Sequence, residues 1–319
     1  MKNKTIVSIW GALVITLMMG CSEKFDADFD EMITEGLVIE GNIISDSTVV
    51  FQLSKTLPLD ITEDNADLFG SYLDVDAELA VKGSDGTSWP GYWRGKGKYG
   101  VEIGTLRPDV EYHLEILYNG DTYRSEPQKP LETIGIENLT FKQPNLDGPV
   151  SIQLDTEMGN VTQAAYFLWY FEEDWEVRTR LVTVDLFDPW TNRIIHYDYP
   201  PVAQGWCYRA TDQILLGTTE SNVENRMVGK TIQTIQNSDE RLSVLYSIRL
   251  QQRTLSRQEY EYYQVQAKLN NEMGGLFTPQ PSELPTNITC SNHSRKVIGY
   301  VGCNMGVIYR QLYVSEEEV

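Results

Sequence analysis

Short alternating runs of apolar and polar residues dominate the chain and predict β-strands. Val75–Val81 alternates strictly, and Glu111–Tyr118 alternates again before Asn119-Gly120, the dipeptide of a two-residue hairpin turn. About seven such runs at regular spacing are typical of a β-sandwich. The sequence therefore predicts a mainly β N-terminal domain of this kind over residues 35–133.

A tyrosine at the start of one run supports an immunoglobulin-like or fibronectin-like sandwich. Leu106-Arg107-Pro108 precedes Tyr112, which begins the next predicted strand. In such domains a tyrosine at this place bonds back to the preceding loop, so we expect the Tyr112 hydroxyl to do the same. The motif predicts a fold and carries no function.

A second β-rich region, residues 134–319, carries the one helix that the pattern predicts. Its apolar runs predict further strands. Ser256 stands three residues before Glu259, which is the spacing of a helix-capping box, and Gly274-Gly275 would end the helix. We therefore expect two β domains, the second with an inserted α-helix near residues 256–273.

Residues 1–20 predict a secretory signal. Lys2 and Lys4 form a basic head, and the apolar run behind them is shorter than the ~20 residues that a membrane span needs. The run ends in Gly20-Cys21, which is typical of a bacterial lipoprotein signal with cleavage after the glycine and a lipid on Cys21. We expect residues 21–34 to form an acidic tether to the membrane.

Length and charge narrow the class of protein further. Removal of the signal leaves about 300 residues, enough for two domains with cores of their own. The formal charge is −20. Because an acidic surface repels polyanions, nucleic acids are not expected as partners.

Three cysteines remain besides Cys21. In an oxidising compartment, Cys207, Cys290 and Cys303 predict one disulfide and one free thiol. Cys290 and Cys303 are the preferred pair because they are close in sequence on strands that look adjacent. Cys207 with either of them is the alternative. A metal site is not predicted, since CxxC spacing is absent.

No catalytic motif accompanies these elements. The chain has no serine-hydrolase elbow, Walker loop or dinucleotide fingerprint. His113, His196 and His293 stand at no metal-ligand spacing. We therefore predict a non-enzymatic protein without a cofactor. The 46 acidic residues keep a carboxylate pair for glycoside hydrolysis open as an alternative.

Two groups of aromatic residues are candidates for contact with a ligand or partner. One is Trp89, Tyr92 and Trp93, and the other is Trp190, Tyr197, Tyr199 and Trp206. Such rings stack on sugars and peptides. They fit core packing or a protein interface equally well, and the sequence leaves these readings open.

Several features recur together in one known family: the Leu37–Gly41 strand, the Tyr112 corner, the aromatic run Tyr166–Trp175, and the block from Glu259-Tyr260 through Gly274–Ser282 to Gly299–Val301. The chain resembles the Bacteroidota lipoproteins of domain of unknown function 4249. The resemblance implies a lipid-anchored outer-membrane protein that faces the cell exterior. It carries over no catalytic residue, and only Cys21 transfers, as the lipidated residue.

The resemblance also implies a role. Such lipoproteins are encoded beside TonB-dependent transporters, so we expect a non-enzymatic accessory subunit of a nutrient-uptake system. Its partners would be the transporter and associated lipoproteins. A surface glycan-binding or peptide-binding protein, or a glycoside hydrolase, is the alternative.

Overall fold

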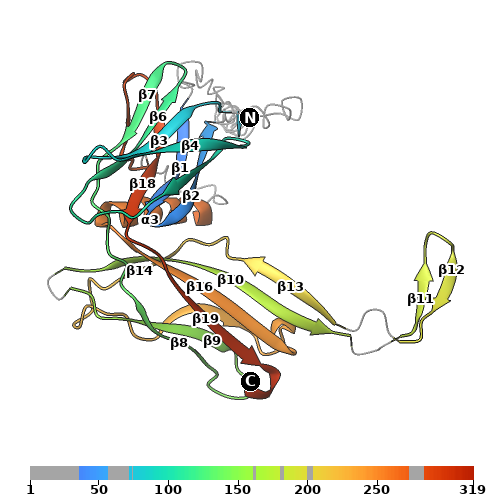
Figure 1. Cartoon of the computed structure of the whole chain (residues 1–319). Helices are drawn as coiled ribbons and strands as arrows, with labels where there is room; N and C mark the ends of the chain where they lie inside the picture. The colour runs from blue at the N-terminus through green and yellow to red at the C-terminus, as the bar shows by residue number, and fades with distance from the viewer. Residues whose placement is uncertain are drawn as a thin grey trace, which may run out of the picture. The chain divides into compact units, whose positions relative to one another are not determined.

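Strands dominate the fold, as the alternating pattern predicts, and the helix α3 (Arg257–Glu272) stands where the capping signal predicts it (Figure 1). The computed structural model describes residues 36–56, 72–73, 75–160, 163–179, 183–199, 204–272 and 284–319. The predicted signal, Cys21, the tether and the Gly274-Gly275 helix end lie outside the described residues. Residues 35–319 form one compact unit.

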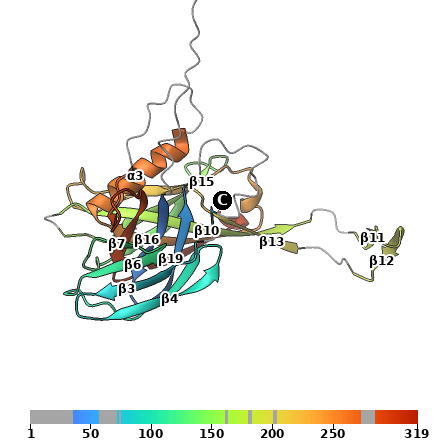
Figure 2. The same ribbon diagram turned by 90° about the horizontal axis from the view of Figure 1, so that it is seen from above.

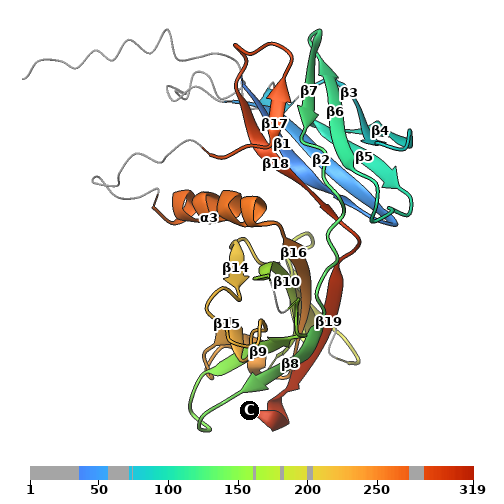
Figure 3. The ribbon, with the colours of Figure 1, turned by 90° about the vertical axis from the view of Figure 1, so that its left-hand side faces the viewer.

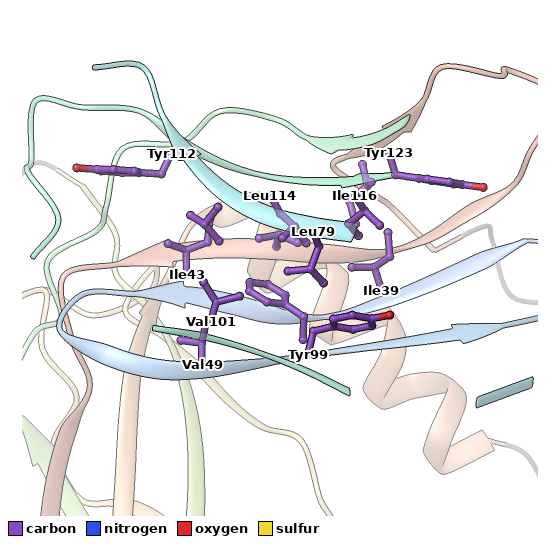
Figure 4. Packing of buried hydrophobic residues seen from close by; sticks show 14 of the residues in the cluster. Ile39, Ile43, Val49, Leu79, Tyr99, Val101, Tyr112, Leu114, Ile116 and Tyr123 are labelled. Carbon is purple, nitrogen blue, oxygen red and sulfur yellow. The ribbon is translucent and has the colours of Figure 1, made fainter. Parts of the chain in front are cut away.

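The first sheet has nine strands in the order β17-β7-β6-β3-β4-β5-β2-β1-β18. The strands are β1 (Leu37–Ile44), β2 (Ser47–Lys55), β3 (Glu78–Gly83), β4 (Ser88–Gly95), β5 (Lys98–Ile103), β6 (Tyr112–Tyr118), β7 (Asp121–Ser125), β17 (Ile288–Cys290) and β18 (Val297–Asn304). Their inward side chains form one apolar core, in which Ile39, Val101 and Leu114 are buried (Figure 4).

The two ends of this sheet meet, so that it closes into a sandwich around its core. β17 contacts both β7 and β18 (Figure 3). The buried Asn287 amide bridges the gap: its Nδ2 donates to Val301 O, and Val301 N–H donates to its Oδ1, both at 2.9 Å. Arg107 N–H donates to the Tyr112 hydroxyl at 2.9 Å, which confirms the predicted tyrosine corner.

The first and last strands of this sandwich pair in parallel. β1 runs alongside β18, with Leu37 opposite Val297 and Ile43 opposite Cys303. Gly299 has φ +136°, and a Cβ there would lie 2.0 Å from Ile39 O, so only glycine allows the close approach. The boundary expected at residue 133 placed β17 and β18 in the second domain. In the structure they complete the first sheet.

The remaining strands form three smaller sheets. A five-stranded sheet has the order β13-β10-β16-β19, with β14 paired to β10; a three-stranded sheet has the order β15-β9-β8; and β11 pairs with β12 (Figure 2). The strands are β8 (Ile136–Lys142), β9 (Val150–Thr156), β10 (Tyr166–Arg178), β11 (Asp185–Asp188), β12 (Arg193–His196), β13 (Gln204–Ala210), β14 (Leu215–Thr218), β15 (Lys230–Ile235), β16 (Leu245–Leu255) and β19 (Ile308–Ser315). The five-stranded and three-stranded sheets share a second apolar core.

A buried ion pair joins α3 to the strands on either side. Arg253 on β16 and Glu259 on α3 are 4% and 1% exposed, with Nη1 and Oε1 2.6 Å apart. Arg253 Nη1 also donates to Asn304 Oδ1 on β18 at 3.0 Å, and Asn304 Nδ2 donates to Thr254 O at 2.7 Å. The helix and one strand from each of two sheets therefore meet at one charged cluster.

The same cluster explains two features of the sequence. Glu259 N–H donates to Ser256 Oγ at 3.1 Å, so the predicted cap of the helix at Ser256 is confirmed. A Cβ at Gly302 would lie 2.5 Å from Glu259 Oε1, so glycine makes room for the carboxylate. Burial raises the pKa of Glu259, and Arg253 opposes that rise.

The structure has Cys207, Cys290 and Cys303 as free thiols, so the disulfide expected between Cys290 and Cys303 is not formed in it. The two buried thiols lie in the core of the first sheet, with Cys290 opposite Tyr123 and Cys303 opposite Ile43 in the strand pairing. Burial, and the charge of Glu259, raise the pKa of Cys303 to about 12.

The buried ion pair gives a stability prediction. Glu259→Gln should lower the free energy of unfolding by about 3–5 kcal/mol, because it leaves the Arg253 charge buried without its partner. The matched control is Glu261→Gln on the same helix, which removes an exposed pair with Arg257 and should cost far less, because water screens that pair. Urea unfolding measures both variants, and equal losses would contradict the role given to Glu259.

Thiol labelling with a maleimide tests the state of the cysteines. In a Cys21→Ala chain at pH 8, we expect the half-buried Cys207 to react quickly and Cys303 to react only after unfolding, because burial and the raised pKa keep its thiolate scarce. Mass spectrometry after unfolding without reductant should find three labels. A single label would instead establish the disulfide expected from the sequence.

Candidate functional site

The five-stranded sheet buries one face and exposes the other. On β10, Phe167, Trp169 and Phe171 point into the second core, whereas Tyr170 lies on the opposite face. Strand pairing extends that exposed face sideways through Gln251 on β16. We call it the aromatic face, and its rings are Tyr170, Trp206, Tyr208, Tyr309 and Tyr313, which are 37–60% exposed.

The centre of the aromatic face is an ion pair. Arg249 Nε donates to Glu172 Oε2 at 3.0 Å, and the Tyr208 hydroxyl donates to Glu172 Oε1 at 3.1 Å. A hydrogen bond from Arg249 to Glu172 raises the pKa of Arg249. Desolvation and, to a smaller extent, the hydrogen bond to Glu172 raise the pKa of Tyr208. The rings thus surround a polar centre whose two charges cancel.

A groove adjoins the aromatic face at one end. It has a volume of about 490 Å³ and is lined by the turn between β1 and β2, by Gly306-Val307, and by Gln251 and Tyr309 of the face. In that turn Asp46 has a positive φ of 52° and accepts hydrogen bonds from Ser45 Oγ at 2.9 Å and Thr105 Oγ1 at 2.6 Å. The face and the groove are continuous because they share two residues.

A second exposed surface lies on β11 and β12, which pair only with each other. We call it the apolar hairpin; it comprises Phe187, Trp190, Ile194, Tyr197 and Tyr199, which are 38–94% exposed. Its turn is well bonded: Asp188 accepts from Trp190 N–H at 2.9 Å and from Thr191 Oγ1 at 2.6 Å, which lowers the pKa of Asp188. The turn therefore fixes the backbone of Trp190, whereas its side chain is 94% exposed.

The structure separates the aromatic residues that the sequence grouped. Trp206 belongs to the aromatic face, whereas Trp190, Tyr197 and Tyr199 belong to the apolar hairpin. On β4, Tyr92 and Trp93 are 45% and 62% exposed, but Trp89 is half-buried and packs on Tyr112 with ring centroids 5.7 Å apart.

Sequence reasoning missed four of the five rings of the aromatic face: Tyr170, Tyr208, Tyr309 and Tyr313. Alternation could have identified two of these rings, because Tyr309, Gln311 and Tyr313 occupy every second position of one strand and so lie on its solvent-facing side. Rings in the polar phase of a strand point away from the core. These rings come together through strand pairing, and alternation along one strand does not predict which strands pair.

β10 also carries a buried carboxylate, Glu173. Glu173 is fully buried and accepts from Arg241 Nη1 at 2.9 Å, from the Tyr246 hydroxyl at 2.7 Å and from Arg209 Nε at 2.8 Å. Burial and the Glu173 charge raise the pKa of Tyr246. Both oxygens of Glu173 are already used by neighbours, so its role is to hold β10, β13 and β16 together.

Among the described residues, no group of three or more His, Cys, Asp or Glu side chains could hold a metal ion. Within the same residues, no helix is long and apolar enough to cross a membrane. The hydrolase alternative stays a prediction, since no carboxylate pair has been assigned to it.

Comparison with known proteins gave one finding. Residues 22–304 match the sequence model of a family described as a domain of unknown function, DUF4249. The match begins directly after Cys21 and ends with the last residue of β18, so it includes α3 and the Arg253–Glu259 pair. A search of curated proteins gave no match.

The exposure of the aromatic face gives a further stability prediction. Tyr309→Ser and Tyr313→Ser should each change the free energy of unfolding by no more than about 0.5 kcal/mol, because both rings already contact water. Trp169→Ala on the buried face should cost about 3–5 kcal/mol, because it leaves a cavity and removes the bond to Gln252. Thermal and urea unfolding measure all three, and a large loss at either tyrosine would mean that the face is structural.

Proposed function

The chain belongs to the DUF4249 family, and on this premise we propose that it is an accessory subunit of a TonB-dependent nutrient-uptake system. In this proposal Cys21 carries a lipid that anchors the protein in the outer membrane, with its body at the cell exterior. The protein is non-enzymatic and contacts the transporter or a lipoprotein associated with it.

The apolar hairpin is the observation that supports a protein partner. A two-stranded hairpin is marginally stable in water, and this one has no core of its own. Phe187, Trp190 and Ile194 are 61–94% exposed, and contiguous exposed apolar side chains mark interaction sites. A turn whose backbone is already bonded needs little further backbone ordering when its side chain enters a pocket, which favours Trp190 as the central contact.

Charge indicates the chemistry of that partner. Asp185, Asp188 and Asp198 accompany the apolar side chains, against Arg193 as the positive group. Such a surface fits an apolar recess with a basic rim. The anionic surface of a membrane would repel the same carboxylates, so a protein recess is the better partner for the hairpin.

Affinity purification from membranes tests the proposal. The lipidated chain, extracted in mild detergent, should retain a TonB-dependent transporter in stoichiometric amount, identified by mass spectrometry. Cys21→Ala should lose it because the unanchored protein leaves the membrane. Trp190→Ser with Ile194→Thr should weaken retention at least tenfold, because it removes the exposed contacts and leaves the anchor in place.

The matched control is Tyr92→Ser with Trp93→Ser, which removes two exposed rings from β4 and should leave retention unchanged. Purification of the lipidated chain alone, without a transporter, would refute the accessory role. Retention by the hairpin variant at the wild-type level would refute the docking role of the hairpin.

A further inference from the structure

The aromatic face alternates rings with hydrogen-bonding side chains. Tyr309 and Tyr313 stand four residues apart on one strand, which is about 13 Å. Tyr309 and Tyr170 lie two strands apart, about 10 Å, with Gln251 between them. An extended ligand that spans two of these rings therefore passes over a hydrogen-bonding group between them.

The centre of the face argues against a protein or lipid as the occupant. The cores of protein interfaces are depleted of charged residues, whereas this centre carries the Glu172–Arg249 pair. Covering that pair with apolar side chains or lipid tails would remove it from water without new hydrogen bonds, which is costly. The occupant must contact rings and hydrogen-bond to charged groups in the same plane.

Sugars meet both requirements, because a pyranose ring has apolar C–H faces and a rim of hydroxyl groups. The C–H faces stack on tyrosine and tryptophan rings. The hydroxyls can donate to carboxylates and accept from a guanidinium. Asp174 lies on the same face with no hydrogen-bond or ion-pair partner among the described residues, so its oxygens are available as acceptors.

We propose that the aromatic face binds a neutral oligosaccharide. Neutrality follows from the charges, since Glu172 and Arg249 cancel and the remaining carboxylate of Asp174 repels an acidic glycan. The adjoining groove extends the site beyond Tyr309, because Asp46 and Thr48 in its turn are exposed polar side chains. The inference goes beyond the accessory role and uses none of the residues of the apolar hairpin.

Binding to a defined set of sugars tests the inference. The full mature chain, kept in a detergent without a sugar headgroup, is screened against an array of neutral oligosaccharides with gluco, manno, galacto and xylo backbones. Hexagalacturonate serves as the acidic comparison. Isothermal titration then measures the affinity for the best ligand. We expect at least one neutral oligosaccharide to bind and hexagalacturonate not to bind.

Two matched pairs of substitutions locate the site. Tyr309→Ser with Tyr313→Ser should weaken binding at least tenfold, whereas Tyr92→Ser with Trp93→Ser on β4 should change it less than twofold. Asp174→Asn should weaken binding and reduce the discrimination against hexagalacturonate. Absence of binding to every neutral sugar, binding to hexagalacturonate alone, or equal losses in the two double variants would each overturn the inference.

The membrane purification separates this inference from the accessory role. The Tyr309 and Tyr313 double variant should still retain the transporter, because the hairpin is intact. Loss of the transporter from that variant would mean that the aromatic face binds a protein, and it would overturn the inference. Sugar binding that depends on these tyrosines would support the inference even when no transporter is retained.

Discussion

The rest of the fold depends on one buried ion pair, Arg253 with Glu259. A charge without its partner is unfavourable in a core, so the pair forms only when β16, α3 and β18 are all in place. The pair and its bond to Asn304 therefore connect the nine-stranded sheet to the five-stranded one. Gly302 and Asn304 are the residues that make room for it and complete its hydrogen bonds.

The two faces of the five-stranded sheet have different roles. The buried network around Glu173 fixes β10, β13 and β16 from beneath, and the opposite side of the same strands carries the aromatic face. The rings thus rest on strands whose positions are set by charged contacts on the other side. A rigid platform of this kind suits recognition of an extended ligand, because little ordering is needed on binding.

The sequence predicted what local periodicity can encode. Alternation identified the strands, the Ser256 spacing located α3, and the Tyr112 motif gave the corner. Local periodicity could not predict the partner of β1, because pairing between positions about 260 residues apart leaves no local signal. For the same reason the aromatic face was not predicted: its rings come from three strands, β10, β13 and β19, and the register between strands brings them together.

The parallel pairing of β1 with β18 also governs the order in which the chain can fold. The N-terminal strand is made first, but the strand beside it lies near the other end of the chain. Closing so long a loop loses chain entropy before the contacts between β1 and β18 can offset that loss. The sandwich therefore cannot close until almost the whole chain is available. A partly synthesised chain therefore keeps β1 with an open edge that can pair with other chains, so a chaperone that covers this edge would protect the chain from aggregation until β18 is made.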